Sequence, residues 1–199
     1  MLGTACGGSA PALQAATPAS VAAQQSDLPP RMVRCDLTGD IDSFIRVEAT
    51  PDPSTSKTIS TEWATAKSKG AQAGYVAVFT DSSDHCKAVK ASATEIGAGS
   101  YELVLNFVVQ FKDEKTAAAA YTDGSILGIT AAELRLQSAV EGSKTGLSSN
   151  SVVVDTTIAN QRYYFALWQA KSFGVFLAVL NVDPGAAKKV ATAENSRIK

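Results

Sequence analysis

The sequence predicts an α+β domain built on an antiparallel β-sheet, with helices packed on one face of the sheet. Apolar and polar residues alternate from Tyr101 to Lys112, which is typical of a strand with one buried and one wet face. Nearer the C-terminus, three apolar runs at 151–158, 162–170 and 173–182 follow one another across short polar turns, as in antiparallel hairpins. The first and the last of these four segments each lead into an aspartate and an Ala-rich stretch, which indicates a capped helix.

Local signals predict the remaining elements. Asp40 caps a short helix, which Pro51 and Pro53 close. Residues 74–80 are apolar on both faces, as expected of a central strand, and the polar run 81–84 predicts a turn. The other expected elements are an extended segment at 32–37, helices at 60–69 and 114–122, a short helix from Thr130 and a last helix from Asp183.

Two stretches indicate an internal repeat. Residues 106–113 and 176–183 each form an apolar strand that ends in an aspartate, and an Ala-rich helix follows both. The repeat favours a domain built twice from a strand–strand–helix unit.

Composition narrows the class of protein. The chain has 199 residues, of which 45% are hydrophobic, and its formal net charge is −1. This balance predicts a folded domain rather than a disordered chain. The lack of a basic excess argues against a nucleic-acid partner, because phosphates must be neutralised by Lys and Arg. The sequence has no apolar run long enough to span a bilayer.

Residues 1–30 differ from the rest of the chain. They carry one charged residue, Asp27, and are otherwise rich in Ala, Ser, Thr, Gln, Gly and Pro. Pro11 and Pro18 interrupt any helix, and ordering such a segment costs about 1–2 kcal/mol per residue in backbone entropy. We therefore expect a flexible tether over 1–30 and a single α+β domain over 31–199, the alternative being an Ala-rich helix that docks on the domain.

The start of the chain resembles the end of a bacterial lipoprotein signal peptide. Thr4 and Ala5 are the small residues that precede the lipidated cysteine in that pattern, here Cys6, whereas Gly3 departs from the larger aliphatic residue expected there. The resemblance implies a lipid anchor on Cys6, through which alone the protein would reach the membrane. The alternative is an incidental cysteine in the tail.

The other two cysteines, Cys35 and Cys86, both have polar neighbours. Buried structural thiols usually have apolar neighbours, and an even pair in an exported protein predicts a disulfide. Closing a loop of about 50 residues would stabilise the fold by roughly 4 kcal/mol through the entropy of the unfolded chain. Two unrelated free thiols are the alternative.

Groups able to carry out catalysis are scarce. The chain has one histidine, His85, so a Ser–His–Asp arrangement would need it together with Asp81 or Asp84. No G-x-S-x-G elbow supports that arrangement, and Cys86 is adjacent to His85 in sequence, where side chains diverge. We therefore expect no catalytic residue.

Metal, cofactor and nucleotide sites also have little support. Zinc would need Cys35, His85 and Cys86, which lack the usual ligand spacings. The aspartates near 36–42 and 81–84 do not follow the calcium-loop pattern, and no phosphate-binding loop occurs. We expect neither metal nor cofactor. The aromatic residues clustered near the C-terminus either line an apolar cleft or fill the core: Tyr163, Tyr164, Phe165, Trp168, Phe173 and Phe176.

The segment from Leu147 to Ile198 resembles the C-terminal half of small bacterial cell-envelope lipoproteins and of extracellular sensor domains of some receptor kinases. Its parts are a Gly-Leu-x-x-Asn-Ser-Val start, the strand holding Tyr164 and Trp168, a Phe-Leu-Ala-Val-Leu-Asn strand from Phe176 and an Ala-rich helix ending in Glu-Asn-Ser-Arg-Ile. The resemblance implies an α+β domain and no catalytic motif.

Together these observations predict an extracytoplasmic, lipid-anchored, non-enzymatic domain that binds an unidentified ligand or an envelope protein. Two alternatives stay open. One is a secreted hydrolase with a site near Asp81–Cys86. The other is a structural accessory subunit that docks an apolar sheet face on a larger complex.

Overall fold

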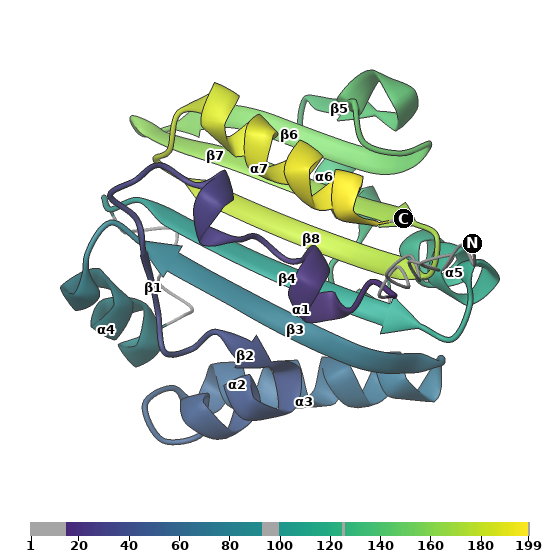
Figure 1. Ribbon diagram of the computed structural model, residues 1–199, viewed down its shortest axis with the longest axis horizontal. Coiled ribbons are helices and arrows are strands. Elements are labelled where there is room, and N and C mark those ends of the chain that lie inside the picture. Colours follow the sequence, from purple (N-terminus) through teal and green to yellow (C-terminus); the bar gives the residue numbers. More distant parts are fainter. Residues whose placement is uncertain (1–14, 93–99, 125, 199) are drawn as a thin grey trace, which may run out of the picture.

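One antiparallel sheet carries the fold, and it confirms the predicted α+β class (Figure 1). The computed structural model describes residues 15–92, 100–124 and 126–198. Within these residues the sheet has eight strands. They are β1 (Val33–Arg34), β2 (Gly39–Asp40), β3 (Ala71–Thr80), β4 (Leu103–Phe111), β5 (Ala139–Glu141), β6 (Asn150–Ile158), β7 (Gln161–Ala170) and β8 (Phe173–Leu180).

The strand order is β1-β3-β4-β8-β7-β6-β5, with β2 also paired to β3. The centre joins the two halves of the chain, because β4 pairs with β8 and places Phe107 opposite Phe176. Strands β6, β7 and β8 form the two predicted hairpins. The first of these turns at Ala159 and Asn160, whose φ values of 49° and 66° give the left-handed geometry that suits a two-residue hairpin.

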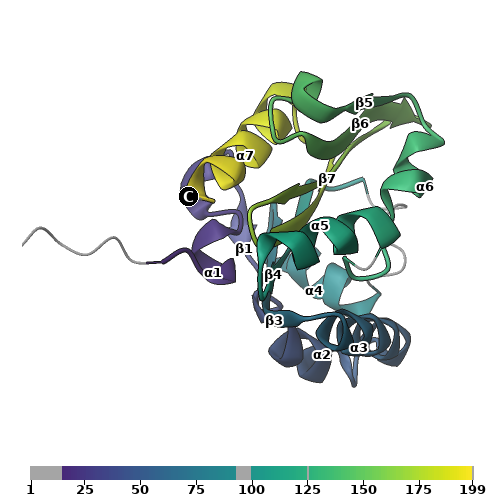
Figure 2. The ribbon, with the colours of Figure 1, turned by 90° about the vertical axis from the view of Figure 1, so that its right-hand side faces the viewer.

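Helices lie on both faces of this sheet. They are α1 (Pro18–Val21), α2 (Ile41–Glu48), α3 (Pro53–Ser68), α4 (Ser83–Ala91), α5 (Glu114–Asp123), α6 (Ala131–Arg135) and α7 (Pro184–Arg197), with the short 3₁₀ turns η1 (Gln25–Asp27) and η3 (Gly142–Thr145). Helices α1 and α7 lie against one face, and the group from α2 to α6 lies against the other (Figure 2).

The prediction that helices cover one face only is therefore wrong, and β4 shows why. Alternate residues of β4 belong to two separate cores: Phe107 packs in the first core, beneath α2 to α6, and Val108 packs in the second core, beneath α1 and α7. Asn106 was expected on a wet face, yet it is fully buried. Its amide is satisfied by bonds to the N–H of Ala23, to the carbonyl of Phe176 and to Glu194.

The predicted tether is wrong for residues 15–30, which belong to the folded domain. Pro18 begins α1 rather than breaking a helix, and Val21 and Ala22 are fully buried in the second core. Small side chains let this segment approach β3 and β4 closely, so the docked helix, the alternative weighed from sequence, is the arrangement found. The predicted lipid site, Cys6, lies outside the described residues.

Two helix boundaries also differ from prediction. Asp52 caps α3, and Pro53 is its first residue, where the missing N–H has no helical partner to lose. The expected turn at 81–84 instead starts α4, because the hydroxyl of Ser82 accepts a hydrogen bond from the N–H of His85. Polar residues at a helix start and in a turn look alike in sequence.

The predicted repeat has the same order of elements in both halves, but it is not a symmetric duplication. Residues that correspond in the two copies point to opposite faces, since Phe107 belongs to the first core and Leu177 to the second. Helix α5 accordingly covers the first core and α7 the second. A two-fold axis relating antiparallel β4 and β8 would place both helices on one face.

Candidate functional site

An apolar pocket lies in the first core, between the sheet and helices α2, α3 and α4. Its volume is about 200 Å³. We call it the apolar pocket, and its lining residues are Leu37, Phe44, Thr55, Ile59, Val78, Val89, Leu105, Phe107, Ile129 and Phe176.

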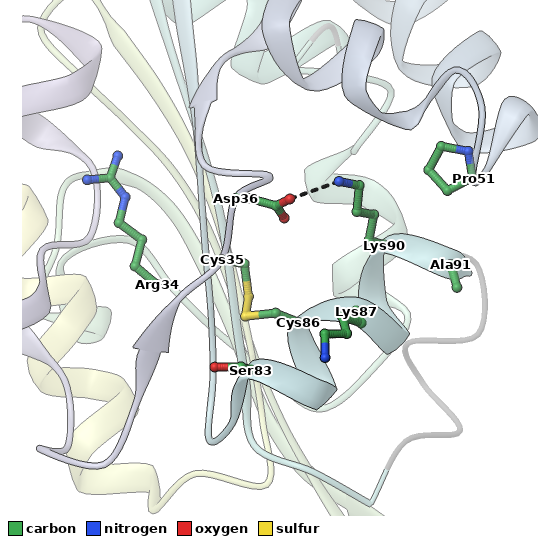
Figure 3. Close-up of a pocket in the computed structure, with 9 residues that line it drawn as sticks. All are labelled: Arg34, Cys35, Asp36, Pro51, Ser83, Cys86, Lys87, Lys90 and Ala91. Atoms are coloured by element: carbon green, nitrogen blue, oxygen red, sulfur yellow. Dashed lines mark hydrogen bonds and ion pairs between the residues drawn. A yellow bond between two sulfur atoms is a disulfide. The ribbon is translucent and has the colours of Figure 1, made fainter.

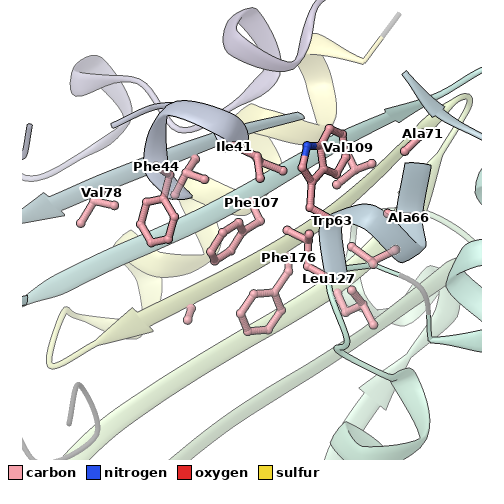
Figure 4. Packing of buried hydrophobic residues seen from close by; sticks show 14 of the residues in the cluster. Ile41, Phe44, Trp63, Ala66, Ala71, Val78, Phe107, Val109, Leu127 and Phe176 are labelled. Carbon is pink, nitrogen blue, oxygen red and sulfur yellow. The ribbon is translucent and has the colours of Figure 1, made fainter. Parts of the chain in front are cut away.

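The floor of the apolar pocket is made by three adjacent strands. Val78 of β3, Phe107 of β4 and Phe176 of β8 extend from the same face of the sheet, and Phe107 lies directly opposite Phe176. Phe44 of α2 meets the edge of Phe107, with ring centroids 6.0 Å apart and an interplanar angle of 77° (Figure 4). Such edge-to-face pairs hold both rings in place.

The helix α2 can lie close to β3 because residue 74 is a glycine. A Cβ atom at Gly74 would overlap the side chain of Ile41 and crowd the ring of Trp63. Both of these residues are buried in the first core. A single missing side chain thus sets how closely α2 approaches the floor of the pocket.

The apolar pocket can hold a small uncharged group. A cavity of about 150 Å³ accommodates a benzene molecule, so this one has room for one ring or a short alkyl chain. Among the described residues that line it, Thr55 alone is polar, and its hydroxyl donates to Asp52 at 2.8 Å. The lining therefore favours recognition by shape and by apolar burial.

Glu48 is a buried carboxylate at the end of α2. It lies one helical turn beyond Phe44, on the same helix face, and it is 0% exposed. Among the described residues, neither of its carboxylate oxygens has a hydrogen-bond partner. Burial, followed by the nearby charge of Asp52, raises the pKa of Glu48 to about 7, although Lys90 opposes the shift. The sequence signal that could have predicted a buried Glu48 is an apolar helix face that ends in a glutamate.

The predicted disulfide is confirmed. Cys35 and Cys86 are bonded, with Cα atoms 5.3 Å apart, and the bond ties the segment after β1 to α4. The disulfide forms one wall of an open hollow of about 390 Å³, which we call the disulfide hollow (Figure 3). In this hollow the ammonium group of Lys90 pairs with the carboxylate of Asp36 at 2.8 Å. Lys87, also on this wall, pairs with Asp84 at 2.8 Å.

His85 stands on the first turn of α4, apart from the apolar pocket. Its Nδ1 bonds to Asp81, and its ring stacks on Tyr101 with centroids 4.8 Å apart. The sulfur of Cys86 is held in the disulfide, so it is available neither as a nucleophile nor as a zinc ligand together with Cys35. No cluster of three or more His, Cys, Asp or Glu side chains suited to a metal occurs in the described part of the chain.

The predicted aromatic cluster is divided between the two faces of the sheet. Phe176 lines the apolar pocket and stacks on Phe165, with centroids 6.4 Å apart. Trp168 and Phe173 are buried in the second core, together with Tyr164. Both readings of the cluster therefore hold in part, since one ring lines a pocket and others fill the core.

Comparison with solved structures shows a similar fold. No family model and no curated protein matches the sequence. Among solved structures, the chain is similar to the extracellular domain of PknH from Mycobacterium tuberculosis, with a TM-score of 0.53 and 10% identity over 93% of this chain and 97% of that chain. A likeness at this level of identity shows a shared fold. No helix within the described residues is long and apolar enough to cross a membrane.

Proposed function

We propose that this chain is an extracytoplasmic, non-enzymatic domain that binds an apolar ligand in the apolar pocket. The observation that carries the proposal is a preformed cavity of about 200 Å³ whose lining is almost wholly apolar. A cavity of this kind leaves apolar surface without packing partners, and a ligand would supply them.

Two observations support the compartment. Disulfides such as Cys35–Cys86 persist in oxidising environments and are rare in the cytosol of most organisms. The solved structure of similar fold is described as an extracellular domain. A lipid anchor on Cys6 stays part of the proposal, on the resemblance of the first residues to a lipoprotein signal.

The other two functions weighed from the sequence have less support. A hydrolase near Asp81–Cys86 would lack its thiol, because Cys86 is oxidised. A structural subunit that docks through a sheet face would need a bare face, whereas helices and the N-terminal segment cover both faces. The exposed large apolar side chains among the described residues are three, so they offer little apolar surface for such docking: Leu136, Val140 and Ile158.

Binding of n-hexanol, followed by NMR, tests the proposal. We expect saturable shifts in the ring resonances of Phe44 and Phe107, because the alkyl chain would contact both rings. In Ile59→Trp the larger ring would fill the apolar pocket and abolish these shifts. Leu136→Trp, at a site that is 82% exposed, is the matched control and should bind hexanol as the wild type does. Shifts that do not saturate, or that survive Ile59→Trp, would contradict the proposal.

A further inference from the structure

A second hollow lies on the opposite face of the sheet from the apolar pocket. Helix α7 packs over β7 on the face of the second core (Figure 1). The hollow is beside the first turn of α7, where residues of η3, β5, β6 and β7 complete its lining, and its volume is about 300 Å³. We call it the α7 hollow. Ligand pockets range from about 300 to 1,000 Å³, so it has room for a small molecule.

One wall of the α7 hollow is apolar. Val140 of β5 and Val153 of β6 both line it, and they lie directly opposite each other in the sheet. Val153 is buried, whereas Val140 is 46% exposed. An alkyl group that packed against this wall would remove the Val140 side chain from water, which is favourable.

Three charged side chains also line the α7 hollow: Lys144 of η3, Lys188 of α7 and Asp155 of β6. None of the three has an ion-pair or hydrogen-bond partner among the residues that the structure describes. In the disulfide hollow, by contrast, Lys87 and Lys90 each pair with an aspartate. The α7 hollow therefore offers a ligand charges of both signs that are not already paired.

Tyr164 of β7 adds a buried hydroxyl to this lining. The residue is only 6% exposed, yet its hydroxyl has no hydrogen-bond partner within the described part of the chain. Burial raises the pKa of Tyr164, and the charge of Asp155, directly opposite on β6, adds to this effect. The hydroxyl thus keeps its proton and can donate it. A buried hydroxyl without a partner is unfavourable, and an acceptor on a ligand would offset that cost.

We propose that the α7 hollow binds a free α-amino acid with an aliphatic side chain. The carboxylate of the amino acid accepts hydrogen bonds from the two lysines and from the hydroxyl of Tyr164. Its ammonium group pairs with Asp155, and its side chain packs against the wall formed by Val140 and Val153. The site is separated from the apolar pocket by the sheet, so this inference does not depend on the proposed function.

The mixture of charges selects this class of ligand. A simple anion would be repelled by Asp155, and a simple cation would be repelled by the two lysines. An α-amino acid carries both charges on adjacent groups, and it can therefore be attracted to all three side chains at once. The apolar wall adds the preference for an aliphatic side chain over a polar one.

Three probes with the same branched alkyl group test the inference: L-leucine, isoamylamine, which lacks the carboxylate, and isocaproate, which lacks the ammonium group. Their affinities are measured by NMR titration of the full chain. We expect leucine to give saturable shifts in the ring resonances of Tyr164 and the methyl resonances of Val153. Each of the other two probes should bind about fivefold or more weakly, because it loses the interactions of one charged group.

Substitutions in the lining assign the two charges. Lys188→Met keeps the length of the side chain and removes its charge, so it should weaken leucine binding about three- to fivefold and leave isoamylamine binding unchanged. The matched control is Lys189→Met, at the next residue of α7, which is exposed and does not line the hollow. This control should bind leucine as the wild type does. Asp155→Asn should weaken leucine binding and should not weaken isocaproate binding.

Several outcomes would overturn the inference. Leucine that gives no saturable shifts excludes the site, and isocaproate or isoamylamine that binds as tightly as leucine excludes recognition of both charges. Equal losses in Lys188→Met and Lys189→Met would indicate a general effect of surface charge. n-Hexanol should not displace leucine, since the sheet lies between the two sites, and competition between them would refute a separate site.

Discussion

Two buried glutamates show how the same side chain can have different surroundings. Glu194 of α7 is fully buried, and its Oε2 accepts a hydrogen bond from the side-chain amide of Asn106 at 2.9 Å. Burial raises the pKa of Glu194 well above its ordinary range, although the nearby charge of Arg197 opposes the shift. Glu48 has no such donor among the described residues. Within the described residues, Glu194 thus has a hydrogen-bond donor for its carboxylate and Glu48 has none.

The stability of the unliganded protein should depend on the ionisation of Glu48. Its pKa rises from 4.5 to about 7 on folding, so between these values the folded chain holds a proton that the unfolded chain releases. The free energy of unfolding therefore falls as pH rises from about 4.5 to 7, by about 3 kcal/mol, and this contribution is constant above pH 7.

Glu48→Gln has no proton to release and should lack this contribution. Urea denaturation of both proteins from pH 4.5 to pH 8 would show the variant gaining about 3 kcal/mol relative to the wild type. Glu114→Gln, exposed on α5, should follow the wild type. Parallel pH profiles for the wild type and Glu48→Gln would show that Glu48 ionises normally in the folded state.

At the scale of elements, the N-terminal segment is fastened to the last helix. The guanidinium of Arg197, on α7, donates to both carboxylate oxygens of Asp27, at 2.8 and 3.1 Å, and to the carbonyls of Val21 and Ala22. The side chain of Asp27 is only 8% exposed. This set of bonds closes the second core at its edge.

Arg197→Ala should therefore destabilise the fold far more than the loss of a surface ion pair. It leaves the Asp27 carboxylate buried without its cation, and we expect the free energy of unfolding to fall by about 3 kcal/mol. Urea denaturation measures the change. Lys87→Ala breaks the exposed pair with Asp84 and should leave stability almost unaltered. Equal losses in both variants would refute a structural role for the Arg197 contacts.

Comparing the predicted elements with the observed ones shows which features of the fold follow from the sequence alone. The long strands were predictable, because alternation and β-rich composition are local: the expected strand at 101–112 is β4, Leu103–Phe111. The packing of residues 15–30 on the domain was not predictable, because Val21 and Ala22 become core residues only through contacts with strands distant in sequence. The disulfide followed from cysteine pairing, whereas the apolar pocket depends on how several elements converge.

For the molecule as a whole, the sheet is a wall shared by two cores. Adjacent residues of β4, such as Phe107 and Val108, belong to different cores. If the sheet came apart, the apolar residues of both cores would therefore be exposed to water. The strand β8 is buried along its whole length and links β4 to β7. The two cores should consequently unfold together.

The two tryptophans of the chain can test this cooperativity, because each belongs to one core. Trp63 of α3 is buried in the first core and Trp168 of β7 in the second. Trp168→Phe leaves the first core as the source of tryptophan fluorescence, and Trp63→Phe leaves the second. In each variant, the urea midpoint from fluorescence should coincide with the midpoint from far-ultraviolet circular dichroism, which follows the whole sheet and its helices. If the fluorescence of one core changed at lower urea than the dichroism of the same variant, that core would unfold separately, and the sheet would not couple the two.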